Sequence, residues 1–248
     1  CTEHSRVTIG VNQLLLSREK TKLLGLPKHD LLINQKYTNK IYNERKWSKK
    51  IIGSEIGIAK SKIIYYTPTF RTIHESLPIN KLSGFTVKKF EDFLEEKDIY
   101  FIYSFHSMNN FTDDLPKTKR IKFVTNDRYP LFDNFELMLE SDMMIGDYST
   151  LATDFSLLKR PQLFIIPDYN QVYESKGFAE DLRSMLPGKE VNSYQELHES
   201  ISKYINNESL FLSDFKSKIE QLHLKYVSQD KKQSRMKYQD YISKNLSN

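Results

Sequence analysis

The sequence predicts an α/β fold with a parallel sheet, and two features of its pattern indicate this. Short runs of apolar, β-branched and aromatic residues alternate with segments that carry apolar residues at helical spacing, as expected for a sheet with helices on its faces. The runs are nearly continuous in apolar residues, which suits strands that are covered on both faces. The chain has 248 residues, of which 39% are hydrophobic and 28% charged, so it can build the core that such a fold needs.

The first part of the predicted sheet consists of two strands with a helix between them. The run "KIIYYTPTFR" (62–71) is expected to form a buried strand that ends at Pro68. The segment "TVKKFEDFLEEK" (86–97) places its apolar residues on one helical face, and Thr86 is a suitable N-cap. The run "IYFIYSFH" (99–106) is expected to form the second strand.

The second part of the predicted sheet continues the same alternation. It comprises a short strand at 121–125, a helix near 132–140, a strand at 142–148, a helix at about 150–158 and a strand at 162–168. In open parallel sheets, ligands bind beyond the carboxyl ends of the strands. The residues that follow each strand are therefore the first candidates for a functional site.

Polar side chains gather at three of these strand ends. They are Thr67, Pro68, Thr69 and Arg71 after the first strand, Ser104 and His106 at the second, and Asp147, Ser149 and Thr150 after the fourth. Each has a structural alternative: Thr69 can be a turn residue, His106 a loop histidine and Ser149 a helix cap. Their common place at one edge of the sheet favours a binding site, and hydroxyls beside free N–H groups at a helix start suit an anion.

The composition limits the classes of function. The single cysteine excludes an internal disulfide framework and a Cys-rich zinc site, and no apolar run is long enough to span a bilayer, so a cytoplasmic protein is expected. The net charge of +5 suits a polyanion or an anionic membrane surface, and residues 214–248 carry eight Lys or Arg against four Asp or Glu. A solvated helical tail explains this segment as well as peripheral membrane contact does. No signature of nucleic-acid binding is present, so nucleic acid is not an expected partner.

Five segments follow the motifs of a known family in the correct order. They are "GLPKHD" (25–30), "YYTPTFR" (65–71), "SFH" (104–106), "SDMMIGDYSTLATDFSLLKRP" (141–161) and "DYNQVYESKGF" (168–178). On these segments the chain resembles the CDP-glycerol glycerophosphotransferase family of teichoic-acid and capsule polymerases and primases. The resemblance covers about residues 20–200.

The resemblance implies a Rossmann-like parallel-sheet lobe of a two-lobed GT-B architecture with a helical C-terminal segment. It divides the chain into three parts. Residues 1–50 would be the end of an N-terminal acceptor lobe and a linker, 51–210 the nucleotide-donor-binding lobe, and 211–248 the C-terminal helical segment.

The activity that the resemblance implies is transfer of glycerol phosphate or ribitol phosphate from CDP-glycerol or CDP-ribitol to a hydroxyl of a growing polyol-phosphate or glycan acceptor. The expected location is the cytoplasm, with peripheral contact to the inner face of the bacterial cell membrane left open as an alternative, and no cofactor or metal is expected. Two alternatives stay open: a nucleotide-sugar glycosyltransferase of the same architecture, and a non-catalytic lobe that binds a nucleotide or polymer.

By resemblance, the CDP-activated donor is contacted by residues that match the family motifs. These are Lys28, Pro68, Thr69, Ser104, Phe105, His106, Ser149, Thr150 and Asp154, and Arg71 and Asp147 are expected to bind substrate at the same edge. His106 is expected to be catalytic, as a donor to the phosphate that is transferred. Asp154 is better suited to orienting the loop or a ribose hydroxyl than to touching phosphate.

The sequence departs from the family pattern at two places. Lys28 stands where the family has Arg, so the positive charge is kept but the bidentate fork is lost. The family's H-G-T segment, whose His is the base for the acceptor hydroxyl, has no counterpart in these 248 residues. The chain, which starts at Cys1 rather than Met, is therefore expected to be a piece of a longer protein or to have lost that half, and to be inactive alone.

Overall fold

The computed structural model contains a six-stranded β-sheet within the residues that it describes, which are 2–53, 60–69, 78–104, 116–125, 128–176, 180–228, 230 and 233–246. The strands are β1 (Lys62–Tyr66), β2 (Ile99–Ser104), β3 (Ile121–Val124), β4 (Met143–Gly146), β5 (Gln162–Phe164) and β6 (Lys189–Glu190). They lie in the order β3-β2-β1-β4-β5-β6, and each neighbouring pair is parallel. This is the strand order of a doubly wound Rossmann sheet, so the predicted fold class is confirmed.

The strand order reverses between β1 and β4. The chain builds outward from β1 through β2 to β3 and then returns to place β4 on the other side of β1, where Tyr66 lies beside Ile145. The carboxyl ends of β1 and β4 are therefore neighbours at the switch point. In open α/β sheets, ligands bind in the crevice outside this point.

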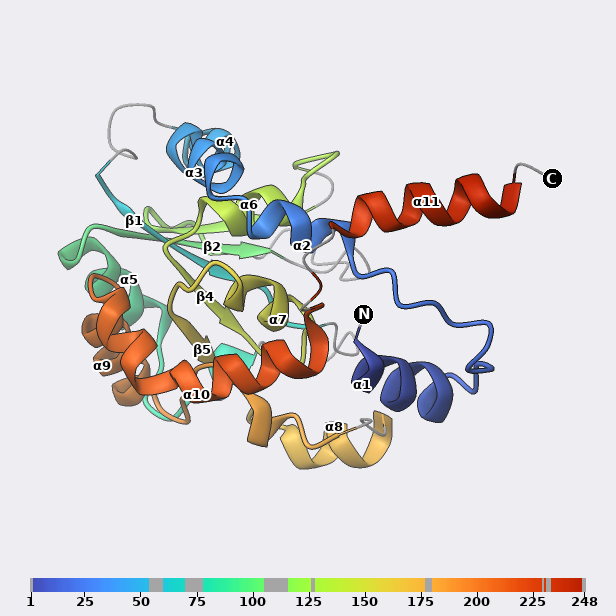
Figure 1. Ribbon diagram of the computed structural model, residues 1–248. Helices are drawn as coiled ribbons and strands as arrows, with labels where there is room; N and C mark the ends of the chain where they lie inside the picture. The colour runs from blue at the N-terminus through green and yellow to red at the C-terminus, as the bar shows by residue number, and fades with distance from the viewer. Residues whose placement is uncertain are drawn as a thin grey trace.

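Two helical layers cover the sheet (Figure 1). One layer contains α5 (Val87–Glu96), α9 (Tyr194–Tyr204) and α10 (Glu208–Tyr226). The other contains α2 (Pro27–Leu32), α3 (Gln35–Glu44), α4 (Lys46–Ile52), α6 (Asn134–Glu140) and α7 (Leu151–Ser156). Ile64 and Tyr66 of β1 pack in the first layer's core, and Ile63 and Tyr65 pack in the second. The period of two along the strand thus buries both of its faces, as the apolar run predicted.

Other helical segments complete the described fold. They are α1 (Glu3–Ser5), η1 (Arg6–Gln13), η2 (Pro78–Lys81), α8 (Tyr169–Lys176), η3 (Arg183–Met185) and α11 (Ser234–Leu246). One of them, η2, adds buried Ile79 to the core of the first layer. In Figure 1, α11 projects away from the sheet towards the C-terminus. Among the described helices, none combines the length and the apolar character that a membrane span requires.

The predicted helices agree with the structure at their cores and differ at their ends. The helix predicted at 86–97 is α5, and the hydroxyl of Thr86 accepts a hydrogen bond from the backbone N–H of Lys89 at 3.2 Å. The helix predicted near 132–140 starts later, because the carboxylate of Asp133 caps α6. The helix predicted at 150–158 is α7, which gives way to a turn after Ser156.

One strand, β6, was not predicted, because Lys189 and Glu190 carry no apolar or alternating pattern. It pairs with β5, where Lys189 lies beside Leu163. Gly188 permits this approach, since a Cβ at that position would lie 2.2 Å from the carbonyl oxygen of Gln162. A close backbone contact, not a sequence pattern, therefore sets this edge of the sheet.

The helices between residues 27 and 52 pack directly on the sheet. Leu32 of α2 and Ile51 of α4 belong to the same buried cluster as Ile63 of β1. The division of the chain at residues 50 and 210 stays a prediction.

Candidate functional site

The ends of β1 and β4 are tied together at the switch point by Thr69 and Asp147. The backbone N–H of Thr69 donates to Oδ2 of Asp147 at 2.7 Å, and the Thr69 hydroxyl donates to Oδ1 at 2.6 Å. Asp147 is 3% exposed. Both carboxylate oxygens thus hold the turn that follows β1 against the turn that follows β4.

Ser104, at the end of β2, is buried and forms a hydrogen bond with another side chain of the protein. Its hydroxyl is 3.0 Å from Oδ1 of Asn134, which also accepts a hydrogen bond from the Tyr65 hydroxyl at 2.6 Å. Burial raises the pKa of Tyr65 to about 12, so the phenol remains a donor. These two hydrogen bonds connect the ends of β1 and β2 to the start of α6.

Ser149 and Thr150 differ in what their hydroxyls do. The Ser149 hydroxyl oxygen accepts a hydrogen bond from the backbone N–H of Leu151 at 3.2 Å, so the capping role considered for Ser149 is present. Thr150 is the N-cap residue of α7, yet its exposed hydroxyl does not cap any described N–H of that helix. The Thr150 hydroxyl is therefore available to a ligand.

A buried carboxylate, Asp154, joins α7 to α2. Its Oδ2 atom is 2.5 Å from Nζ of Lys28, and its Oδ1 atom is 3.0 Å from Nε2 of His29. The side chain of Asp154 is 3% exposed and that of Lys28 is 42% exposed. The carboxylate of this ion pair is therefore buried, whereas its ammonium partner is partly accessible to solvent.

A cavity of about 410 Å³ adjoins these residues. Thr150 and Asp154 of α7, Asp147 and Tyr148 before it, and Lys28 line one part of it. The rest of its wall includes Ser5 of α1, Leu26, His29, and residues of η1, of α10 and of the segment 180–187. A cavity of this size beside the carboxyl end of a parallel strand is typical of a small-molecule site.

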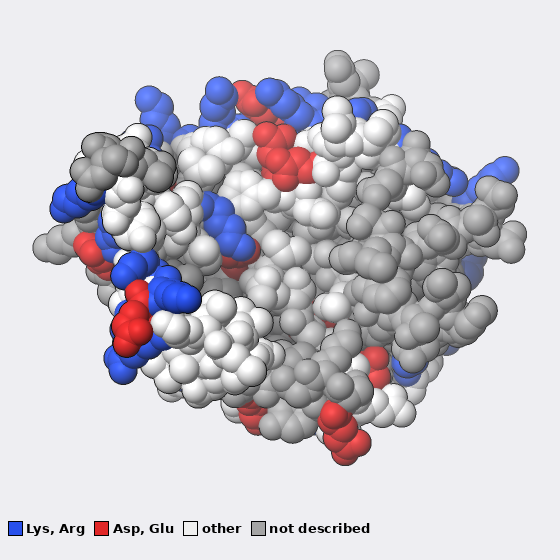
Figure 2. Space-filling view, turned by 90° about the vertical axis from the view of Figure 1, so that its right-hand side faces the viewer, with Lys and Arg blue, Asp and Glu red and all other residues white. Residues whose placement is uncertain are grey.

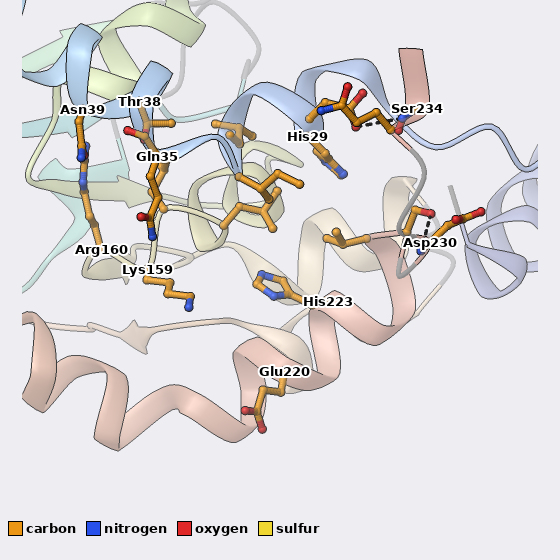
Figure 3. Close-up of a pocket in the computed structure, with 18 of the residues that line it drawn as sticks. His29, Gln35, Thr38, Asn39, Lys159, Arg160, Glu220, His223, Asp230 and Ser234 are labelled. Atoms are coloured by element: carbon orange, nitrogen blue, oxygen red, sulfur yellow. Dashed lines mark hydrogen bonds between the residues drawn. The ribbon is translucent and has the colours of Figure 1, made fainter. Parts of the chain in front are cut away.

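A larger cavity of about 1040 Å³ lies between α2, α3, the end of α7 and α10, and His29 lines both cavities. Figure 3 shows His29 and His223 on opposite walls of the larger cavity. Nε2 of His223 is 2.8 Å from the Ser156 hydroxyl oxygen. Burial first, and then the electrostatic influence of the nearby His29 and Lys159, lowers the pKa of His223. The lining of the larger cavity contains both acidic and basic side chains. Its charge therefore does not indicate whether a ligand would be anionic or cationic.

The structure brings together part of the predicted site. Lys28, Asp147, Thr150 and Asp154 line the smaller cavity. Pro68, Thr69, Ser104 and Ser149 lie at the same edge of the sheet, outside the residues that line this cavity. Arg71, Phe105 and the predicted catalytic His106 lie outside the described residues, so their roles stay predictions.

Sequence reasoning missed Tyr148 at the cavity, and it named His29 only as a candidate base to be tested if the chain alone showed turnover. Tyr148, whose hydroxyl donates to Oδ1 of Asp168 at 2.6 Å, lies inside the longest motif between Asp147 and Ser149. His29 directly follows Lys28 in "GLPKHD". Adjacency to predicted site residues was the available signal in both cases.

Comparison with known proteins gives the family. The model of the family described as CDP-Glycerol:Poly(glycerophosphate) glycerophosphotransferase matches residues 12–244. The teichoic acid glycerol-phosphate primase of Bacillus subtilis is 28% identical over 207 residues, which are 83% of this chain and 51% of that protein. The teichoic acid ribitol-phosphate polymerase TarK of Staphylococcus aureus is 23% identical over 179 residues, which are 71% of this chain and 33% of that protein.

A solved structure agrees in fold. The wall teichoic acid polymerase TagF superposes with a TM-score of 0.70 at 22% sequence identity, over 99% of this chain and 56% of that chain. The chain thus spans about half the length, or less, of the relatives that it matches. Because the family model covers most of its residues, the chain belongs to the CDP-glycerol:poly(glycerophosphate) glycerophosphotransferase family.

Proposed function

We propose that this chain is the donor-binding part of an enzyme that transfers a polyol phosphate from a CDP-activated donor to a hydroxyl of a growing teichoic-acid-like or capsule polymer. The observation that carries the proposal is the cavity beside the carboxyl end of β4, lined by Lys28, Thr150 and Asp154 from the motifs of the family. Relatives named as a glycerol-phosphate primase and as a ribitol-phosphate polymerase support a donor of either kind.

The geometry suggests where the donor would lie. A diphosphate at the start of α7 would meet the Thr150 hydroxyl and the partly exposed Lys28 ammonium. The acceptor oxygen would attack the β-phosphorus of the CDP-polyol, the bond from this phosphorus to the oxygen of CMP would break, and CMP would leave. The protein would contribute position and charge stabilisation, as in other phosphoryl transfers.

The acceptor and the membrane belong to the same proposal. An acceptor that grows on a lipid would place the enzyme at the inner face of the cell membrane. On α11, exposed Met236 and Ile242 lie near basic Arg235 and Lys244, which suits an anionic surface. On the face drawn in Figure 2, however, the described Lys and Arg side chains are interspersed with Asp and Glu. The membrane contact therefore rests on α11 and not on the face drawn in Figure 2.

A ligand screen tests the proposal. Calorimetric titration of the chain with CDP-glycerol and CDP-ribitol is expected to show binding, whereas UDP-sugars should bind at least about tenfold more weakly. Stronger binding of a UDP-sugar would favour a glycosyltransferase, and no binding of any nucleotide would favour a non-catalytic polymer-binding lobe.

The variant Ser149→Ala with Thr150→Ala locates the binding. Loss of charge-assisted hydrogen bonds of about 1.5–3 kcal/mol each predicts at least a tenfold loss of CDP-polyol affinity in a folded protein. The matched control, Ser217→Ala on α10, should leave affinity unchanged. If the folded double variant binds the CDP-polyol as tightly as wild type, Ser149 and Thr150 do not contact the donor and have only a structural role.

A further inference from the structure

A buried histidine to which the family motifs assign no role contacts residues of the proposed donor site. His29 lies in α2 directly after Lys28 and is 6% exposed. Its Nε2 atom is 3.0 Å from Oδ1 of Asp154. Its position is a variable one in the motif that "GLPKHD" matches.

The two oxygens of Asp154 have partners in different environments. Oδ1 contacts His29, whose side chain is 7% exposed, and Oδ2 contacts Lys28, whose side chain is 42% exposed. A carboxylate buried to this degree requires compensating donors. Among the described side chains, Lys28 and His29 are the two that pair with the buried Asp154 carboxylate. Without His29, Lys28 would have to stabilise this carboxylate alone.

This sharing bears on what Lys28 can do. A lysine that alone compensates a buried carboxylate is held by it, because separating the pair leaves an unpaired buried charge. With the hydrogen bond from His29 in place, Asp154 keeps one partner when the Lys28 ammonium turns towards a ligand. The freedom of Lys28, which lines the cavity, to turn towards a ligand thus depends on His29.

We propose that His29 is a positioning residue for donor binding. Its hydrogen bond keeps Asp154 paired, and this lets the ammonium of Lys28, at the wall of the smaller cavity, contact the diphosphate of a CDP-activated donor. The inference rests on the proposed function. His29 acts through Asp154 and Lys28, because its Nε2 atom is directed at the carboxylate.

The first test compares two replacements of His29 by titration with CDP-glycerol. His29→Leu removes the hydrogen bond at similar volume, and we expect it to weaken affinity about tenfold, the loss expected for one such bond. In His29→Gln, the side-chain amide can donate to Asp154 in place of Nε2 but has no acid–base chemistry near neutral pH. We expect affinity within about threefold of wild type for His29→Gln.

A double-mutant cycle with Lys28→Met tests whether His29 acts through Lys28. In the Lys28→Met background, His29→Leu should cause little further loss of affinity, because coupled residues are not additive. His198→Leu is the matched control, since His198 on α9 packs against the Phe93 ring at 4.2 Å in the opposite helical layer. Its affinity should equal that of wild type.

The outcomes separate this inference from the proposed function. If the wild-type chain does not bind CDP-glycerol, the proposed function fails and the inference fails with it. If the wild type binds, then additive losses in the cycle, or a His29→Gln variant as weak as His29→Leu, would overturn the inference alone. Should His29→Leu not fold, His29→Asn replaces it in the cycle, since its shorter amide cannot span the same contact.

Discussion

At the scale of single residues, a buried aspartate at the start of β4 holds the second helical layer to the sheet. Asp142 is 2% exposed and accepts hydrogen bonds from Tyr42 at 2.6 Å and from Arg45, Lys62 and the backbone N–H of Ile63 at 2.9 Å each. A buried charge is tolerated only with such ligation. The carboxylate therefore joins the end of α3 to β1.

We expect Asp142→Ala to lower the free energy of unfolding by about 3–5 kcal/mol, because it leaves the buried Arg45 guanidinium without its carboxylate. Urea denaturation followed by circular dichroism measures this. The control, Asp92→Ala, removes an exposed carboxylate that pairs with Lys88 on α5 and should change the stability by less than about 1 kcal/mol. Equal effects of the two substitutions would contradict the role given to Asp142.

At the scale of elements, the motif "GLPKHD" fixes α2 against the start of α11. The Asp30 carboxylate accepts hydrogen bonds from the backbone N–H groups of Ser234 and Arg235 at 3.0 Å each, and so caps α11. Gly25 has φ +81°, and a Cβ there would lie 2.2 Å from Oγ of Ser234. The same six residues supply Lys28 to the cavity. One short motif thus serves both packing and the site.

The N-terminal segment is held to α10 by Glu180. Its carboxylate contacts Nε2 of His4 at 2.8 Å, Nζ of Lys225 at 2.7 Å and the hydroxyl of Tyr226. Burial alone would raise the pKa of Glu180, but the hydrogen bonds from these three groups lower it to about 2. The charged form of Glu180 therefore stabilises the fold.

This depressed pKa predicts an acid-sensitive contact. The stabilisation is present above the unfolded-state pKa of 4.5 and is lost as the pH falls towards about 2. Urea denaturation of wild type and Glu180→Gln should show a stability difference near pH 6 that shrinks steadily below pH 4.5. Glu199→Gln, an exposed change on α9, should show no such trend. A difference that does not vary with pH would refute the assignment to Glu180.

At the scale of the whole molecule, binding and turnover are expected to separate. The proposed donor site lies within the 248 residues, whereas the chain covers about half of its relatives and contains no H-G-T segment. Transfer needs a base on the acceptor hydroxyl and a site that excludes water.

We therefore expect this chain to bind CMP or a CDP-polyol without releasing CMP above background. The assay is CMP release from labelled CDP-glycerol with a lipid-linked acceptor, for this chain and for a version extended upstream through an H-G-T segment. Turnover by both proteins would place the base within the present sequence, and His29→Gln and His106→Gln would then be the first variants to assay.

The sequence alone determined the features that depend on near neighbours. The continuous apolar runs predicted β1 and β2 as strands of a parallel sheet, and Thr86 predicted the start of α5, because strand and helix periodicity and capping act over a few residues. The strand assignments also predicted which strand ends carry polar residues, because each polar residue directly follows its strand in the sequence.

Only the tertiary structure decided how distant residues meet. Asp154 contacts His29 across 125 positions of the chain, and Asp30 caps α11 across 204. The pairing of a buried charge depends on which elements pack together, which no local pattern records. For the same reason β6 was missed, because its two polar residues join the sheet only where Gly188 lets the backbone approach Gln162.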